Sequence, residues 1–371
     1  VLDWTNFVGA QDPNPFNQPD MLTDPKKIST WVDNSVAAVQ AAGLDGVVLD
    51  IEDGFTDAPH RDGLTHAVCE MKAKLSAAIP GSLLVFDSAF YAQGNQYPFA
   101  PIANCSDLIQ PMTYCDDVNY DQYGTPPKVG MACNPLPVLK TAMAALGKVG
   151  VPPGKIAPLL PWFGLRYTCA SSSGHGTTAC PLVNQTPGSL PSPSNAAMSY
   201  GHIQAVASSG HDVASGPATH KDAYVPGCVG GKASAPRLDR DQAASFIDIK
   251  GPDCHHQIWF DSPQSLPLKY KWLDDNGFAG IGVWTADMVA SINEYWWSGT
   301  NATSAKPLPP GCMGKPGANC SEDKAQTRRN AKEMWGIVPT RSLARVRSAK
   351  SDDSPPLVAP PHLKYMTGYG T

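Results

Sequence analysis

The sequence predicts an α/β protein whose core is a parallel β-sheet. Short apolar runs rich in β-branched residues alternate along the chain with segments whose apolar residues recur at helical spacing. Repeated strand-then-helix units of this kind join parallel strands through right-handed crossovers. With 371 residues, 42% of them hydrophobic and 16% charged, the chain is long enough for one large α/β barrel or for two smaller domains.

The amino-terminal part contains the first of these units. The run Val47-Val48-Leu49, followed by Ile51, is short and apolar, as in a parallel strand buried on both faces. Helical spacing of apolar residues is clearest around Trp31. We therefore expect strands over 1–7, 46–52 and 82–90, and helices over 25–42 and 67–78.

The middle of the chain continues the alternation and then departs from it. We expect a strand over 107–114, a helix over 135–150 and a strand over 155–164. The region from 170 to 236 is rich in Ser, Gly, His and Pro and is too long for a simple connection, which predicts an insertion or an active-site loop system. Beyond this region we again expect regular elements: a strand over 255–260, a helix over 263–276 and a strand over 280–287.

The charge balance limits the classes of partner. A net charge of -5 and a pI near 6.0 provide neither a basic face for nucleic acid nor a polybasic patch for a membrane surface. No apolar run approaches the roughly 18 residues of a membrane span. We expect a monomer that acts on a small neutral or sugar-like substrate.

Ten cysteines indicate an oxidising compartment. They do not form paired C-x-x-C motifs, so disulfides are favoured over a metal site. The pairing stays open, with Cys169/Cys180 and Cys312/Cys320 as plausible loop staples and Cys105/Cys133 as a plausible crossover link.

Four N-x-[ST] sequons agree with a glycoprotein of the secretory route. The chain begins at Val1 rather than Met, so we expect an upstream segment. These features predict a lysosomal, vacuolar or secreted protein. The sequons are at Asn104, Asn184, Asn301 and Asn319.

Polar and aromatic residues gather at the ends of the expected strands. Asp50 and Glu52 share one face of their strand, because side chains alternate along a strand. Asp87, Tyr114 and Trp284 each stand near the end of another strand. Active residues of α/β barrels lie at the carboxyl ends of the strands, so these five residues indicate one sugar-sized site. A salt-bridged strand end is the alternative for the carboxylates, and core packing is the alternative for the aromatic residues.

Histidine spacing does not indicate a metal site. No two histidines form an H-x-x-x-H pattern on a helix, so we expect solvated loop residues rather than ligands. The histidines concerned are His175, His202, His211, His220, His255 and His256.

Several blocks carry a family resemblance. "DGVVLDIE" at 45–52 resembles the D-G-x-D-x-D-x-E signature of glycoside hydrolase family 18, and "MTY" at 112–114 resembles its M-x-Y-D strand. The chitobiase branch of that family is similar in further blocks, in an interval from 1 to about 338 that is interrupted around 211–236. These blocks are "PWFGLRYTC", "LDRDQ", "HQIWFDSPQSLPLKYKW" and "GIGVWTAD".

The resemblance implies a TIM-type (β/α)8 barrel over 1–339, followed by a basic, Ser- and Pro-rich stretch over 340–371 that we expect to be disordered. It also implies hydrolysis of β-1,4 N-acetylglucosaminide bonds with retention, in which the acetamido oxygen of the substrate is the nucleophile. Chitobiose-containing oligosaccharides and chitin fragments are the implied substrates, and no metal or organic cofactor is implied. Endo and exo cleavage both stay open.

The same resemblance assigns roles to the catalytic residues. Glu52 would act as the acid and then as the base for water. Asp50 would orient the acetamide N–H and help to keep Glu52 protonated. Tyr114 would form a hydrogen bond with the acetamide carbonyl.

Three further residues would bind the sugar. Trp284 would form an apolar floor under the ring. Asp87 would make a supporting contact, and Met112 would line the site as part of the matched strand.

Three departures from the family pattern leave other functions open. Val48 stands where the family usually has Asp and the chitobiase branch has Asn, and Cys115 stands where the family has Asp, although Asp116 follows. Val1 aligns best with the third barrel strand, so we expect a barrel that lacks its first two strands. An inactive, chitin-binding lectin-like protein and a non-functional fragment are the alternative interpretations.

Overall fold

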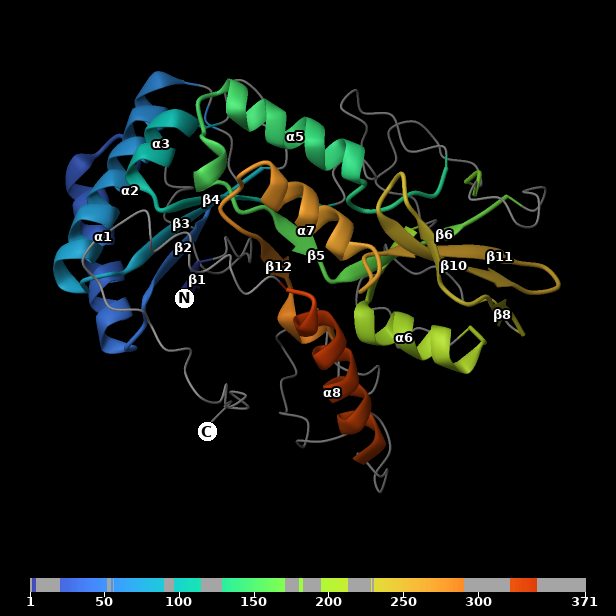
Figure 1. Cartoon of the computed structure of the whole chain (residues 1–371). Helices are drawn as coiled ribbons and strands as arrows, with labels where there is room; N and C mark the ends of the chain where they lie inside the picture. Colours follow the sequence, from blue (N-terminus) through green and yellow to red (C-terminus); the bar gives the residue numbers. More distant parts are fainter. Residues whose placement is uncertain are drawn as a thin grey trace.

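The fold is described from a computed structural model (Figure 1). It describes residues 2–4, 21–51, 55, 57–89, 97–114, 129–170, 180–182, 195–212, 228, 230–289 and 321–338. The expected tail over 340–371 and the pair Cys312/Cys320 lie outside these residues.

Six parallel strands form one row that resembles half of a barrel (Figure 1). The first four pair in chain order, and isolated parallel bridges from Ile109 to Ile156 and from Met112 to Leu159 connect the fourth to the fifth. The sixth pairs with the fifth. The expected parallel sheet is thus confirmed, whereas the lack of two barrel strands stays a prediction. The strands are β1 (Leu2–Trp4), β2 (Gly46–Asp50), β3 (Leu83–Ser88), β4 (Leu108–Pro111), β5 (Leu159–Pro161) and β12 (Gly282–Trp284).

Helices cover one face of this row, and local signals explain where they begin. Before α1 (Pro25–Ala41), the Asp24 carboxylate accepts a hydrogen bond from the Lys26 N–H at 2.9 Å. The helix α2 (Ala58–Ala78) begins earlier than the predicted position 67, because Asp57 caps it by accepting from the His60 N–H at 3.1 Å. The other helices on this row are α3 (Phe99–Cys105), which the sequence did not predict, the 3-10 helix η2 (Pro153–Lys155), α5 (Leu136–Lys148) and α7 (Leu266–Asp275).

A second sheet is antiparallel and follows the order β7-β6-β11-β10-β8, with β9 paired to β10. The predicted strand over 155–164 is wrong as a single element, because β5 ends at Pro161 and the chain enters this second sheet at Phe163. The strand predicted over 255–260 exists but belongs to the second sheet. The strands are β6 (Phe163–Thr168), β7 (Asn195–Ser199), β8 (Lys232–Ala233), β9 (Arg237–Asp239), β10 (Ala244–Lys250) and β11 (His255–Phe260).

The expected loop system over 170–236 is only partly loop. It contains β7, β8 and the helix α6 (Tyr200–Ser209), which Ser199 caps by accepting from the His202 N–H at 3.2 Å. Short polar and apolar stretches there lack clear periodicity, and pairing with distant β6 is what orders β7. The insertion therefore helps to build the second sheet.

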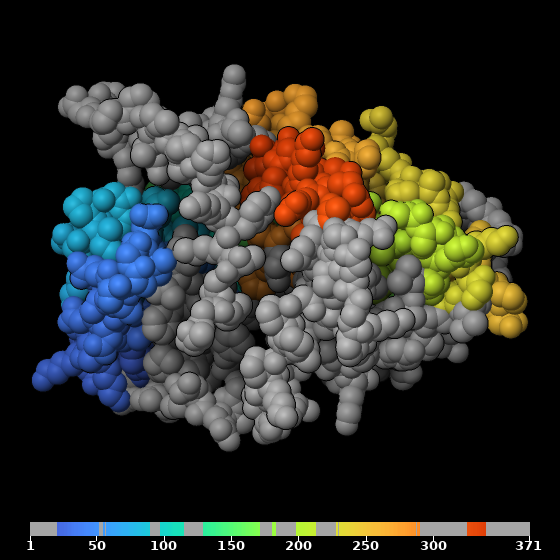
Figure 2. All heavy atoms as spheres, turned by 90° about the horizontal axis from the view of Figure 1, so that it is seen from below, coloured from blue at the N-terminus to red at the C-terminus, as the bar shows by residue number. Residues whose placement is uncertain are grey.

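Two elements near the carboxyl terminus were not predicted. The short helix η3 (Ala286–Val289) follows β12, and α8 (Ser321–Gly336) packs against it, with the Asn330 amide donating to the Val289 carbonyl at 2.9 Å. Figure 2 shows α8 beside α6, where the Tyr200 hydroxyl donates to Glu333 at 3.4 Å. These contacts hold the end of β12 in place.

The described cysteines are all oxidised. The pair Cys169–Cys180 is confirmed, whereas Cys105/Cys133 is wrong, because Cys105 bonds Cys69 across α2 and α3. Cys133 also forms a disulfide, and the third pair between described residues is Cys228–Cys254. Among the described helices, none is both long and apolar enough to cross a membrane.

Candidate active site

Two carboxylates lie next to each other where β2 and β3 end. Asp50 and Asp87 are directly paired in the parallel register, so about 4.8 Å separates their backbones. Both are buried, at 6% and 4% exposure. Leu49 and Phe86 point to the opposite face, toward the helices, and are fully buried. The alternation of side chains along both strands thus places the two carboxyl groups on the inner face of the half-barrel.

Glu52, the expected proton donor, lies outside the described residues. It follows Ile51, the last described residue after β2. Its role stays a prediction.

Gln110, which was not predicted as a site residue, extends the row of polar residues onto β4. Its backbone pairs with Asp87 in register. The side-chain amide nitrogen of Gln110 lies so close to Gly282 of β12 that a Cβ atom at position 282 would collide with it. The same Cβ atom would lie 2.6 Å from the Leu159 side chain. Gly282 thus leaves room for the Gln110 side chain on the inner face, and no local sequence signal predicts this contact.

Tyr114 and Trp284 come together from the ends of β4 and β12. Their rings stack with centroids 6.2 Å apart and an interplanar angle of 24°. Phe163, which was not predicted either, contacts Tyr114 edge-on at 5.9 Å. Because Tyr114 and Trp284 are only half-buried, this cluster offers an apolar surface beside the inner face of the sheet.

Hydrogen bonds to backbone carbonyls fix the strand ends that carry this cluster. The Trp162 N–H donates to the Trp284 carbonyl at 2.8 Å, and the Met112 N–H donates to the Ser88 carbonyl at 2.9 Å. The Thr113 hydroxyl donates to the Leu159 carbonyl at 2.5 Å. Met112 is thus held at the end of β4 with a half-buried side chain.

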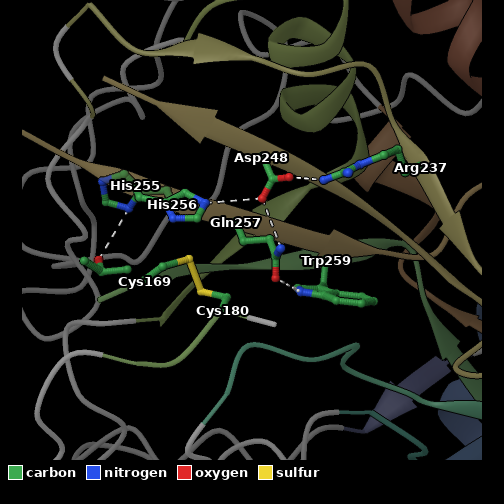
Figure 3. Close-up of a disulfide and its surroundings, with 9 residues drawn as sticks. Cys169, Cys180, Arg237, Asp248, His255, His256, Gln257 and Trp259 are labelled. Atoms are coloured by element: carbon green, nitrogen blue, oxygen red, sulfur yellow. Dashed lines mark hydrogen bonds and ion pairs between the residues drawn. A yellow bond between two sulfur atoms is a disulfide. The ribbon is translucent and has the colours of Figure 1, made fainter. Parts of the chain in front are cut away.

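The second sheet carries a polar network of its own (Figure 3). Asp248 accepts from the Gln257 amide at 3.1 Å and pairs with Arg237 and with His255. The Trp259 indole N–H donates to the side-chain oxygen (Oε1) of Gln257 at 2.5 Å. These groups bind one another and thereby stabilise the sheet.

The histidines are not all solvated, contrary to the prediction. His202 on α6 and His256 on β11 are buried, whereas His211 is exposed and His255 half-buried. His175 and His220 lie outside the described residues.

One histidine has metal-ligand neighbours. His256 and the sulfurs of Cys228 and Cys254 lie within 4.8 Å of one another. The two sulfurs are joined in a disulfide, so they are not available as thiolate ligands.

The burial of His256 predicts a loss of stability in acid. Burial, and secondly the nearby Arg166 guanidinium, lower the pKa of His256 from 6.5 to about 4. As the pH falls, His256 therefore takes up a proton in the unfolded chain before it does so in the folded protein. The free energy of unfolding falls by up to about 3 kcal/mol between pH 6.5 and 4. Urea unfolding at pH 7 and pH 4.5 should show this loss in the wild type. In His256→Gln the loss should be smaller, and an equal loss in both proteins would contradict the assignment.

Comparison with known proteins adds to this geometry. The family model "Glycosyl hydrolases family 18" matches residues 7–288. The di-N-acetylchitobiase of Mus musculus is 25% identical over 329 residues, which cover 86% of this chain and 74% of that protein.

Two solved structures share the fold. A GH18 chitinase from Cycas revoluta in complex with (GlcNAc)3 is 17% identical, with a TM-score of 0.55 over 88% of this chain and 79% of that one. The chitinase-like agglutinin RobpsCRA from Robinia pseudoacacia is 19% identical, with a TM-score of 0.53 over 74% and 73%. Together with the family match, these structures imply a TIM-barrel-like fold, of which the row of six strands is the described part.

The family match covers every strand from β2 to β12, and so includes both carboxylates and the aromatic pair. The chain belongs to family 18 of the glycosyl hydrolases and is a glycosidase.

Proposed function

We propose that the protein hydrolyses β-1,4 N-acetylglucosaminide bonds in chitobiose-containing oligosaccharides, with retention and with assistance from the substrate. The observation that carries this proposal is the pair of buried carboxylates, Asp50 and Asp87, on the same inner face as the stacked Tyr114 and Trp284. A polar end and an apolar surface in one site suit an N-acetylated sugar, which has a polar acetamide and an apolar ring face. The di-N-acetylchitobiase relative and the chitinase complex with (GlcNAc)3 support the same class of substrate.

In the first step, Glu52 donates its proton to the leaving glycosidic oxygen while the acetamido carbonyl oxygen attacks C1. The attack forms an oxazolinium ring, whose positive charge the Asp50 carboxylate stabilises by accepting its N–H. In the second step, the Glu52 carboxylate takes a proton from water, which attacks C1 and opens the ring with net retention.

The aromatic residues and the second carboxylate position the sugar. The Tyr114 hydroxyl donates a hydrogen bond to the acetamide carbonyl, and Trp284 lies under the ring. Asp87 supports Asp50 from the neighbouring strand, and Met112 lines the site beside Tyr114.

The stereochemistry of the first product tests the mechanism. Proton NMR of chitotriose digestion should show the β-anomer of the new reducing end before mutarotation. First appearance of the α-anomer would contradict assistance by the acetamide, because direct attack of water inverts C1.

A second candidate function is sugar binding without turnover. It is favoured by Val48, which puts an apolar side chain beneath Asp50 on the inner face, and by the fold shared with an agglutinin. Binding of chitotriose without any release of N-acetylglucosamine by purified protein would support it over hydrolysis.

Replacement of Trp284 tests the apolar surface. Trp284→Ala, made in a Glu52→Gln background to prevent hydrolysis, should weaken chitotriose binding by about 1–3 kcal/mol in calorimetry. The matched control is Trp272→Ala, because Trp272 lies on α7 and packs on Phe278 at 5.4 Å, away from the strand ends. Equal affinity of the two variants for chitotriose would show that Trp284 does not contact the sugar.

A further inference from the structure

A tyrosine reaches the backbone between the two carboxylates of the matched family motif. The Tyr97 hydroxyl donates a hydrogen bond to the Ile51 carbonyl at 2.8 Å. Ile51 stands between Asp50 and Glu52 in the sequence. The register of β2 with β3 ends at Asp50 and Asp87, so the tyrosine holds the chain one residue beyond the last described pair of the ladder.

The ring of Tyr97 is itself fixed by two aromatic neighbours. It meets Phe86 of β3 at a centroid distance of 5.6 Å and an angle of 76°. It meets Phe99, the first residue of α3, at 5.5 Å and 78°. All three residues are buried in the core between the sheet and the helices. Edge-to-face contacts with both neighbours fix the direction of the hydroxyl group, because a shifted ring would lose packing on both rings.

We propose that Tyr97 is a positioning residue for the Asp50 carboxylate at the end of β2. Its hydroxyl fixes the Ile51 carbonyl and thereby the backbone at the end of β2, which carries Asp50. A misplacement of about 1 Å between reacting groups can lower a rate by about 10²-fold. This inference rests on the proposed function, because it assigns Tyr97 a part in that reaction without contact to the substrate.

The test is Tyr97→Phe, which removes the hydroxyl and keeps the ring between Phe86 and Phe99. The matched control is Tyr167→Phe. The Tyr167 hydroxyl is also buried and donates to a backbone carbonyl, that of Met131, at 2.9 Å in the second sheet. Both variants lose one buried hydrogen bond to a carbonyl, so they should lose similar thermal stability.

We expect Tyr97→Phe to lower kcat for chitotriose about tenfold and to leave KM within about twofold, because alignment of the reacting groups is lost while sugar contacts stay. Tyr167→Phe should keep kcat within about twofold. Amide hydrogen exchange over 47–52 should become about tenfold faster in Tyr97→Phe only, as expected for a locally released strand end.

Each outcome has a definite meaning. An unchanged kcat in Tyr97→Phe, or an equal loss of kcat in Tyr167→Phe, would overturn the positioning role while the wild type still hydrolyses the substrate. Unchanged exchange over 47–52 would overturn it as well. Absence of turnover in the wild type would instead contradict the proposed function, and the positioning role would fall with it.

Discussion

Glu52→Gln is expected to lower kcat for chitotriose by about 10²–10⁴-fold, the contribution typical of a general acid and base. Glutamine keeps the size of the side chain and removes the proton that the leaving oxygen needs. Binding of the sugar should be almost unchanged, because the amide still forms hydrogen bonds. Release of N-acetylglucosamine gives kcat, and calorimetry with chitotriose gives the affinity.

The matched control is Glu70→Gln on α2. Glu70 pairs with Lys74 at 2.8 Å and accepts from the Ser29 hydroxyl at 2.8 Å, on the helical layer outside the sheet. A partly exposed pair of this kind contributes little to stability, so this variant should hydrolyse chitotriose as the wild type does. Comparable turnover in Glu52→Gln and Glu70→Gln would show that Glu52 is not the acid.

Asp50→Asn is expected to have the second largest effect, a loss of about 10²-fold in kcat, the size found when one group that stabilises developing charge is removed. The amide cannot balance the positive charge of the oxazolinium ring. Loss of a neighbouring negative charge also makes the proton on Glu52 easier to remove, so the pH optimum should move to lower pH. Rates measured from pH 3 to pH 8 test both effects.

Two comparisons sharpen this test. Asp87→Asn changes the register neighbour of Asp50 and should cost less, because the proposed role of Asp87 is support. The double variant Asp50→Asn with Glu52→Gln should be barely slower than Glu52→Gln alone, since groups that act together are not additive. A larger loss of kcat in Asp87→Asn than in Asp50→Asn would assign charge stabilisation to Asp87 and support to Asp50. An unchanged pH optimum in Asp50→Asn would argue against coupling of Asp50 with Glu52.

The parallel half of the fold was predictable because its information is local. Several strands of the row, such as β2, are short apolar runs, and the alternation of side chains in β2 separates the face of Asp50 from the face of Leu49. The ends of β3, β4 and β12 then predicted the neighbourhood of Asp87, Tyr114 and Trp284, which the register and the ring contacts bring into one row of strands.

The second sheet was not predictable in the same way. At the break between β5 and β6, the Trp162 N–H donates to the Trp284 carbonyl, so residues far apart in the sequence meet there. β10 pairs with β9 and β11 in an antiparallel sheet that the strand-then-helix pattern does not announce. The contacts of Gln110 with Gly282 and of Tyr97 with Ile51 are non-local in the same sense.

The bond between Trp162 and Trp284 also has a consequence for synthesis of the chain. β5 receives its partner β12 only after the intervening residues of the second sheet have left the ribosome. Until then the growing row ends in an unpaired strand, which can pair wrongly with another chain. Contacts of such large sequence separation form slowly. The row of parallel strands therefore cannot be completed before the chain beyond the second sheet has been synthesised.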